Sequence, residues 1–243
     1  MARSFDGSER IIPSANIGLS TWSFTAWIYQ TSRGSGYDRF FAQAGFNTDL
    51  AIRGTGFGTA LLSDYNSLDA TWSSVGSPIS ANTWYHVGFS FDGTNIVTYL
   101  NGASLASVVR GKALSGASVI GDYGGHTGAT NGNQWIGNLA EMAVYSGVLS
   151  AAQFASLGAG FAPSMVGKPT HYWPLIGRAS AEIDPFGASD GALTVTGNAA
   201  HPRIIYPNQR NRGQQWTTAA AAGALVGHRL TRGMLLERLS LVA

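Results

Sequence analysis

Two carboxylates stand at alternate positions in the stretch Glu182-Ile183-Asp184. On a β-strand both would project from one face, and retaining glycoside hydrolases use two carboxyl groups about 5–5.5 Å apart. However, the next residue is Pro185, which cannot donate a hydrogen bond to a sheet, and Phe186 takes the alternate position where a third acid could stand. The sequence therefore predicts that Glu182 and Asp184 belong to a polar turn, with a catalytic pair as the less favoured alternative.

Histidine is the other residue type that could carry acid–base chemistry, but the five histidines are widely scattered, at positions 86, 126, 171, 201 and 228. A catalytic His86 would need a nucleophile or a carboxylate within hydrogen-bond reach, and the sequence nominates none. The sequences GxSxG, HExxH and Walker A are also absent. We therefore expect no enzyme activity and no catalytic cofactor, and we interpret Trp84 and His86 as scaffold residues.

The elements around these residues have the pattern of β-strands. Residues 84–91 alternate between two faces, one with Trp84, His86, Gly88 and Ser90, the other with Tyr85, Val87, Phe89 and Phe91. This period of two is typical of a half-buried strand, and the second set is the expected core face. Asp92-Gly93 predicts a turn, residues 96–100 a return strand, and Asn101-Gly102 a second turn.

Short strands separated by glycine-rich turns are expected along the rest of the chain, at residues 19–29, 40–45, 50–53, 59–63, 67–75, 119–121 and 134–145. Uneven apolar spacing in the last of these predicts a bulge or bend near Gly137. Residues 150–157 predict a short helix with Ser150 as its N-cap. Together with 32 Gly and only 12% charged residues, strands recurring at short intervals indicate a single all-β sandwich.

Charge is unevenly distributed along the chain. Residues 1–200 carry 9 Lys+Arg and 12 Asp+Glu, a net charge of −3, whereas residues 201–243 carry 6 Arg and 1 Glu, a net charge of +5. A basic tail can bind nucleic acid, dock on an acidic protein surface, or simply be solvated. Because its arginines are not interleaved with stacking aromatic residues, we favour docking on protein and do not expect nucleic-acid binding.

No cysteine is present, so the sequence excludes disulfides and thiolate metal sites. We find neither an apolar core of a signal peptide near residue 1 nor an apolar run long enough to span a bilayer. The sequence therefore predicts a protein made in the cytoplasm without a signal peptide and without a membrane partner.

Several pieces of the chain carry a family resemblance: SFDG at residues 4–7, FTAWIY at 24–29, TWYHVGFSFDG at 83–93, YLNG at 99–102 and IGNLAEMAVYSGVLSAAQFASL at 136–157. In their order and spacing, over about residues 3–160, the chain resembles a LamG-like domain. The resemblance implies an all-β, concanavalin A-like jelly-roll sandwich with a C-terminal extension. Residues 1–206 are then the sandwich, and residues 207–243 are a basic tail that becomes helical when docked.

Residues 170–206 resemble the extension that completes such domains with a final strand pair. Tyr172, Trp173 and Leu175 would lie in one strand, and Leu193 and Val195 in the other.

The resemblance also implies two kinds of ligand at the rim of the sandwich. Many LamG domains hold one Ca²⁺ there, for which Asp49 and Asp122 are candidates by loop position. Glycan binding needs an aromatic face beside amide or hydroxyl groups, and the loop at residues 122–133 offers this in Tyr123, His126, Asn131 and Asn133. The alternative in both cases is an ordinary polar loop.

Chains that resemble this one occur among tailed-phage structural proteins. This implies a non-enzymatic protein on the virion surface, as a capsid decoration or fibre module, with weak affinity for host glycans. A carbohydrate-binding adhesin is the alternative, and a glycoside hydrolase is less favoured. The tail would bind other virion proteins or a second copy through residues Arg210, Arg212, Arg229, Leu230, Arg232, Leu235 and Leu239.

Overall fold

The computed structural model describes residues 2–33, 36–43, 48–54, 61–66, 71–76, 78–109, 113–122, 133–176, 181–187, 190–193 and 197–206. The chain divides into two units, Met1–Ile204 and Ile205–Ala243, and the strands and helices that the structure describes lie in the first. The predicted docking tail lies outside the described residues, as do three of the four predicted rim-loop residues, Tyr123, His126 and Asn131.

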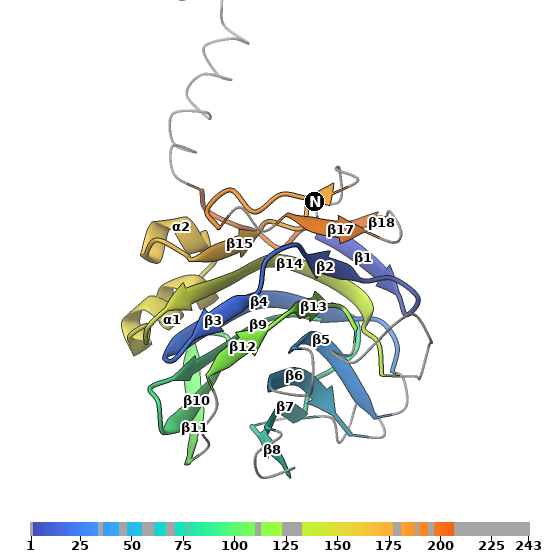
Figure 1. Cartoon of the computed structure of the whole chain (residues 1–243). Coiled ribbons are helices and arrows are strands. Elements are labelled where there is room, and N and C mark those ends of the chain that lie inside the picture. The colour runs from blue at the N-terminus through green and yellow to red at the C-terminus, as the bar shows by residue number, and fades with distance from the viewer. Residues whose placement is uncertain are drawn as a thin grey trace, which may run out of the picture. The chain divides into compact units, whose positions relative to one another are not determined.

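One sheet of the first unit, which we call sheet A, has eight strands (Figure 1). They are β1 (Ala2–Asp6), β4 (Trp22–Gln30), β9 (Trp84–Phe91), β10 (Asn95–Leu100), β11 (Ala103–Val109), β14 (Ile136–Ser146), β15 (His171–Trp173) and β18 (Gly197–Ala199). Their order across the sheet is β11-β10-β9-β4-β14-β1-β18, and β15 pairs with β14 beside this path. Because β14 and β18 both pair with β1, segments far apart in the sequence complete one layer.

The second sheet, sheet B, also has eight strands. They are β2 (Ile11–Pro13), β5 (Tyr37–Gln43), β6 (Thr48–Arg53), β7 (Leu61–Asn66), β8 (Thr71–Val75), β13 (Ser118–Ile120), β16 (Ala181–Glu182) and β17 (Gly191–Leu193). Their order is β16-β17-β2-β13-β5-β6-β7-β8. A separate pair joins β3 (Ile17–Leu19) to β12 (Leu114–Gly116).

The main hydrophobic core lies between the two sheets. Phe24 of β4 packs against Phe40 and Phe41 of β5, with ring centroids 5.9 Å and 5.1 Å apart, and Phe89 of β9 lies 6.4 Å from Phe40. All four rings are fully buried, and aromatic side chains contribute large apolar areas to such cores. The predicted all-β sandwich is confirmed.

The outer face of β9 is buried as well from His86 to Ser90, which corrects the expectation of a half-buried strand for that part, whereas Trp84 is partly exposed. Helix α1 (Ala151–Gly158) packs on this face, where the Phe154 ring stacks on Tyr99 at a centroid distance of 3.9 Å. Gly88 leaves room for that ring, because a Cβ there would overlap Phe154. A second apolar cluster therefore covers part of sheet A from outside, formed by Tyr99, Ala143, Tyr145, Leu149, Phe154, Leu157 and Tyr172.

The predicted N-cap of this helix is confirmed. The Ser150 hydroxyl accepts a hydrogen bond from the Gln153 N–H, and the Gln153 side chain accepts one from the Ser150 N–H, which makes a capping box. A second short helix, α2 (Pro163–Val166), follows. Within the described part of the chain, neither helix is long and apolar enough to cross a bilayer.

The bulge in β14 lies further along the strand than predicted. The register with β4 shifts between Ala140 and Ala143 rather than near Gly137. Inside the bulge, Glu141 takes a left-handed conformation with φ of 52°, and its N–H donates to Pro174 O. The Glu141 carboxylate accepts a hydrogen bond from the Tyr172 hydroxyl and lies 3.0 Å from His201 Nε2. Contacts with the later segment at residues 172–201 therefore stabilise this bulge. The spacing of apolar residues within β14 could not predict these contacts.

The strands of the extension do not pair with each other as predicted. β15 pairs with β14 of sheet A, whereas β17 pairs with β2 of sheet B. Leu175 lies outside β15 with φ of 55°, and Val195 lies outside the described residues. The extension thus contributes β15 and β18 to sheet A and β16 and β17 to sheet B, and the short strands β16 and β17 pair with each other.

Candidate functional site

Four residues form a line across the outer face of sheet A. In the strand register Trp84 of β9 lies opposite Tyr29 of β4, Tyr29 lies opposite Asn138 of β14, and Asn138 lies opposite Ser4 of β1. Their chain neighbours Ile28, Leu139 and Phe5 belong to the core, so the line faces away from it. We call Trp84, Tyr29, Asn138 and Ser4 the aromatic–amide row.

All four residues of the row are partly exposed, in contrast to the buried half of the same face under α1. The Tyr29 and Trp84 rings lie 5.3 Å apart at an interplanar angle of 49°. Trp27, two residues before Tyr29 on β4, is also partly exposed and lies edge-on to His86 at 5.5 Å. The open half of sheet A therefore presents three aromatic side chains to solvent.

The polar groups of the row are available to a ligand. The Tyr29 hydroxyl, the Asn138 amide and the Ser4 hydroxyl make no hydrogen bond within the described residues. An aromatic surface beside free amide and hydroxyl groups is the chemistry that sugar rings require, because their C–H faces pack on aromatic rings and their hydroxyls form hydrogen bonds.

Packing beside the row, on the same face of sheet A, supports Trp27. His86 is fully buried, and its Nε2 lies 2.6 Å from Thr25 Oγ1. Burial lowers the pKa of His86 from 6.5 to about 3, so the imidazole is neutral near pH 7. Among the described residues His86 contacts Thr25 and Trp27 and is bonded to no carboxylate, a setting that fits its interpretation as a scaffold residue.

A second polar surface lies on the outer face of β5 and β6. Asp49 is fully buried, and its Oδ2 lies 2.7 Å from Arg39 Nε. The Arg39 and Arg53 guanidinium carbons lie 5.8 Å and 5.7 Å from the centre of the partly exposed Tyr37 ring. The predicted rim residue Asn133 borders this surface, because its carbonyl accepts from the Arg39 N–H. Of the predicted sites, Asp49 and Asn133 are thus brought near each other.

Arginines pair with both carboxylates of the predicted calcium site, which stays a prediction. Asp49 pairs with Arg39, and Asp122 pairs with Arg10 at 3.5 Å. Burial raises the pKa of Asp49, although Arg39 opposes this effect. Ca²⁺ takes six to eight oxygen ligands, and in the part of the chain that the structure describes no three acidic or histidine side chains gather to hold a metal.

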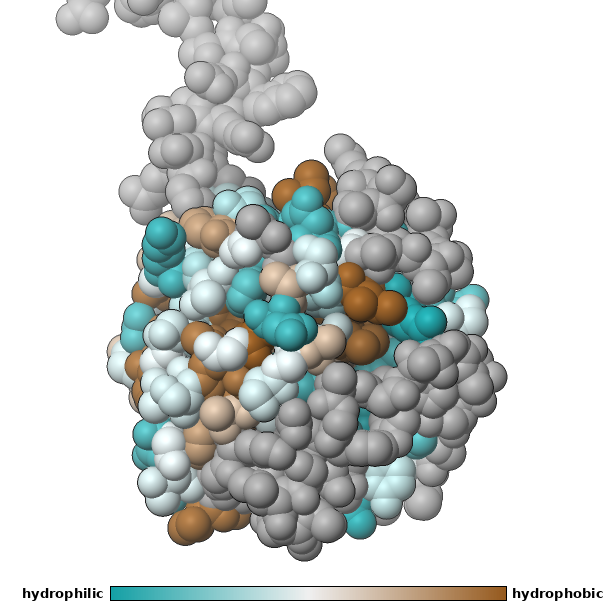
Figure 2. Space-filling view, viewed as in Figure 1, coloured by the Kyte–Doolittle hydropathy of each residue, from teal (hydrophilic) through white to brown (hydrophobic). Residues whose placement is uncertain are grey.

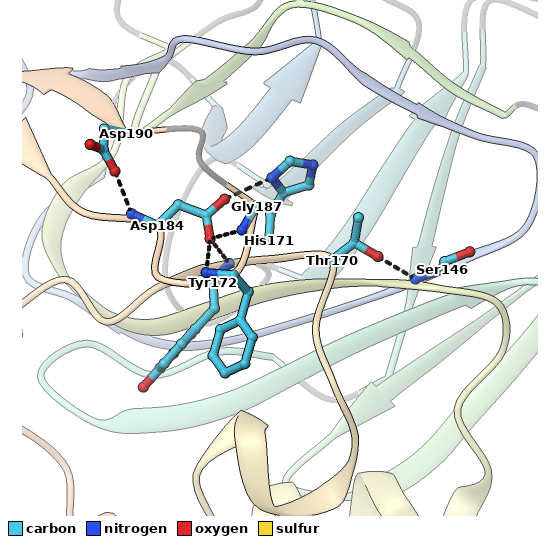
Figure 3. A network of polar contacts seen from close by, with 8 residues as sticks. Ser146, Thr170, His171, Tyr172, Asp184, Gly187 and Asp190 are labelled. Atoms are coloured by element: carbon cyan, nitrogen blue, oxygen red, sulfur yellow. Dashed lines mark hydrogen bonds and ion pairs between the residues drawn. The ribbon is translucent and has the colours of Figure 1, made fainter.

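Glu182 and Asp184 are both buried. Asp184 Oδ1 accepts hydrogen bonds from the Phe186 and Gly187 N–H groups of the turn that follows it, as the predicted polar turn requires, whereas Glu182 lies before this turn. Glu182 lies in β16 and binds Arg3, while Asp184 Oδ2 lies 2.8 Å from His171 Nδ1. Figure 3 shows Asp184 pointing toward His171, Tyr172 and Gly187, with Asp190 bonded to its backbone. Burial alone would raise the pKa of Asp184, but hydrogen bonds from His171 and backbone N–H groups lower it. Both carboxylates therefore hold the extension in place.

Large hydrophobic side chains elsewhere on the surface do not form a comparable aromatic site. In the view of Figure 2, hydrophobic residues appear in several separate groups among hydrophilic ones. The strongly exposed ones among the described residues are Ile12, Val109, Val148, Met165, Ile176, Ile183 and Phe186. Only Phe186 in this set is aromatic, so the aromatic–amide row remains the best candidate for a sugar.

Sequence reasoning missed this row, although a signal was present. In residues 22–29 and 84–91 the core residues alternate with a second set that includes Trp27, Tyr29 and Trp84. Large aromatic residues on the presumed solvent face of two strands indicate a ligand surface. The alignment of Asn138 and Ser4 with them depends on pairing between distant strands, which the sequence alone does not reveal.

Comparison with protein families gives one match that covers most of the sandwich. The sequence pattern described as the concanavalin A-like lectin/glucanases superfamily matches residues 6–155. No curated protein matches the chain.

Solved structures resemble the sandwich at low sequence identity. A putative carbohydrate binding protein from Bacteroides ovatus shares 20% identity, with a TM-score of 0.67 over 84% of this chain and 61% of its own. A heptameric SAP-like pentraxin from Limulus polyphemus shares 20% identity, with a TM-score of 0.54 over 65% of this chain and 81% of its own.

Domain 4 of AbnA, an extracellular arabinanase from Geobacillus stearothermophilus solved with arabinotriose, shares 19% identity. Its TM-score is 0.51 over 65% of this chain and 76% of its own. These likenesses establish a shared fold. The chain spans about three-fifths of the Bacteroides protein.

Proposed function

Because the chain belongs to the concanavalin A-like lectin/glucanases superfamily, we propose that it is a carbohydrate-binding module whose ligand lies on the aromatic–amide row. The observation that carries this proposal is the alignment of partly exposed Trp84 and Tyr29 with the unbonded Asn138 amide. Two proteins with this fold support it: one is named a putative carbohydrate binding protein, and the other was solved with arabinotriose.

The proposed binding chemistry divides between two halves of the row. A sugar ring would place its C–H face against Trp84 or Tyr29 and gain from apolar burial. Hydroxyl groups would then exchange hydrogen bonds with the Asn138 amide, which both donates and accepts. Strands, rather than loops, carry all four residues, so the site needs little ordering on binding.

Binding without hydrolysis is part of the proposal. Cleavage of a glycosidic bond by two carboxylates needs one as acid and the other as nucleophile or base. Glu182 is engaged by Arg3, and Asp184 by His171 and three backbone N–H groups. These contacts support binding without hydrolysis, because both carboxylates are already paired inside the protein and do not face a substrate.

The virion-surface role inferred from the sequence stays a proposal, together with synthesis in a host cytoplasm and the other virion proteins as partners. A glycan-binding sandwich is compatible with a fibre or decoration module that contacts a host cell. Mass spectrometry of purified particles would test this role, and absence of the chain from the particle would exclude it.

A glycan array probed with the full chain tests the proposed function. We expect binding to a defined set of saccharides, and we expect Trp84→Ala to weaken it roughly thirtyfold or more, as for an aromatic hot spot worth about 2 kcal/mol. Tyr37→Ala is the matched control, because it removes a partly exposed aromatic ring from sheet B. Loss in Tyr37→Ala but not in Trp84→Ala would move the site to β5 and β6, and an empty array would refute the function.

A further inference from the structure

The aromatic–amide row has a defined length. Its four residues come from the adjacent strands β9, β4, β14 and β1, one from each. Neighbouring strands lie about 4.8 Å apart, so the row spans roughly 14 Å from the first strand to the fourth. The strand spacing is close to the length that one sugar unit adds to an extended oligosaccharide. Each step along the row can therefore meet a separate sugar unit.

The chemistry changes from one end of the row to the other. Trp84 and Tyr29 offer ring faces at the β9 end, while Asn138 and Ser4 offer amide and hydroxyl groups at the β1 end. A single sugar unit cannot contact both ends. A ligand that satisfies the whole row presents C–H faces at one end and hydroxyl groups at the other.

The charges around the row disfavour an acidic ligand. None of its four residues is charged, and Arg3, the nearest cation on β1, turns to the other side and binds Glu182. Asp6, two residues from Ser4 on β1, is exposed and accepts hydrogen bonds from Ser8. The described residues on this face thus bring a negative charge near the Ser4 end and no compensating positive one.

From these three observations we infer that the ligand is a neutral oligosaccharide of at least three units, lying across the strands from Trp84 to Ser4. The inference rests on the proposed carbohydrate-binding function. It adds the ligand's charge, its minimum length and its direction on the sheet.

Isothermal titration calorimetry with the full chain tests the length. The probes are neutral cello-, malto-, xylo- and arabino-oligosaccharides of one to five units. In the series that binds, we expect affinity to rise with each unit up to three or four and then to level off. Equal affinity for the monosaccharide and the trisaccharide would overturn the inference and leave the proposed function intact.

A variant at Ser4, the end of the row opposite Trp84, tests whether the ligand lies across the strands. Ser4→Ala should weaken trisaccharide binding roughly twofold to tenfold, the value of one neutral hydrogen bond, and leave disaccharide binding unchanged. Ser156→Ala on α1 is the matched control, since Ser156 is partly exposed like Ser4 and its hydroxyl donates only to Ala152 O of its own helix. An equal effect of Ser4→Ala on both ligand lengths, or none on either, would contradict a ligand that reaches from Trp84 to Ser4.

A charged oligosaccharide tests whether the ligand is neutral. Trigalacturonic acid should bind no more tightly than its methyl ester, and tighter binding of the acid would overturn the inference of a neutral ligand. If no probe and no array saccharide binds, the proposed function fails together with the inference.

Discussion

Arg3 Nη2 lies 2.8 Å from Glu182 Oε1, although 179 residues separate the two side chains along the sequence. Arg3 belongs to β1 of sheet A and Glu182 to β16 of sheet B, so the pair joins the two sheets. Their side chains are 1% and 2% exposed. Buried charges are costly unless each has its partner, so the two residues depend on each other.

Removing only one member of this pair should destabilise the fold strongly. We expect Arg3→Met to lower the free energy of unfolding by about 3–5 kcal/mol, because Glu182 is left as a buried charge. The double variant Arg3→Met with Glu182→Leu should recover much of this loss. Urea unfolding measures both, and additive effects of the two substitutions would show that the residues are not coupled.

Gly88 should tolerate no side chain while α1 is packed on sheet A. A methyl group at this position overlaps the Phe154 ring, so we expect Gly88→Ala to cost about 1–3 kcal/mol, as overpacking does. Combining it with Phe154→Leu should remove part of the added penalty. Thermal unfolding of the single and double variants checks this, and a neutral Gly88→Ala would show that α1 is displaced at little cost.

The buried His86 should make the protein sensitive to mild acid. Its folded-state pKa of about 3 lies below the value of 6.5 for an exposed imidazole, so protonation favours the unfolded chain. Stability is complete above pH 6.5 and falls as the pH drops toward 3, by up to about 1.4 kcal/mol per pH unit. His86→Gln should lose less stability than the parent between pH 7.5 and 5. Equal losses in urea unfolding would exclude His86 as the cause.

Removal of calcium should leave the protein unchanged. Arg39 and Arg10 already balance the carboxylates of Asp49 and Asp122, and a second cation beside them would be repelled. We expect the melting temperature and glycan affinity to be the same in Ca²⁺ and in EDTA. A rise of several degrees with Ca²⁺ would contradict this expectation and support the predicted rim site.

The basic tail is expected to mediate assembly. Size-exclusion chromatography with light scattering would compare the full chain with a chain ending at Tyr206. We expect only the full chain to associate, through leucines 230, 235 and 239 together with the arginines. Two identical monomers would show that the tail serves no self-association.

Local signals predicted the fold well wherever a structure depends on neighbours in sequence. The hairpin of β9 and β10 follows from alternation and the Asp92-Gly93 turn, and α1 follows from the Ser150 cap. These features need only a few adjacent residues, so the sequence specifies them directly.

Features that depend on distant segments were predicted poorly. The outer face of β9 was expected to be solvent-exposed, because the sequence near Gly88 carries no signal that Phe154 packs there. Glu182 looked like a turn residue because its partner Arg3 lies at the other end of the sandwich sequence. The aromatic–amide row was missed for the same reason: its four residues come together only when four strands pair.

The pairing of β1 with β14 and β18 has a consequence for synthesis on the ribosome. At about 5–20 residues per second, roughly ten to forty seconds pass between the emergence of β1 and that of β18. During this interval Phe5 and Arg3 have no completed sheet to enter. Until the last strands are released, the nascent chain exposes apolar surface and unpaired strand edges, the features that favour aggregation during folding.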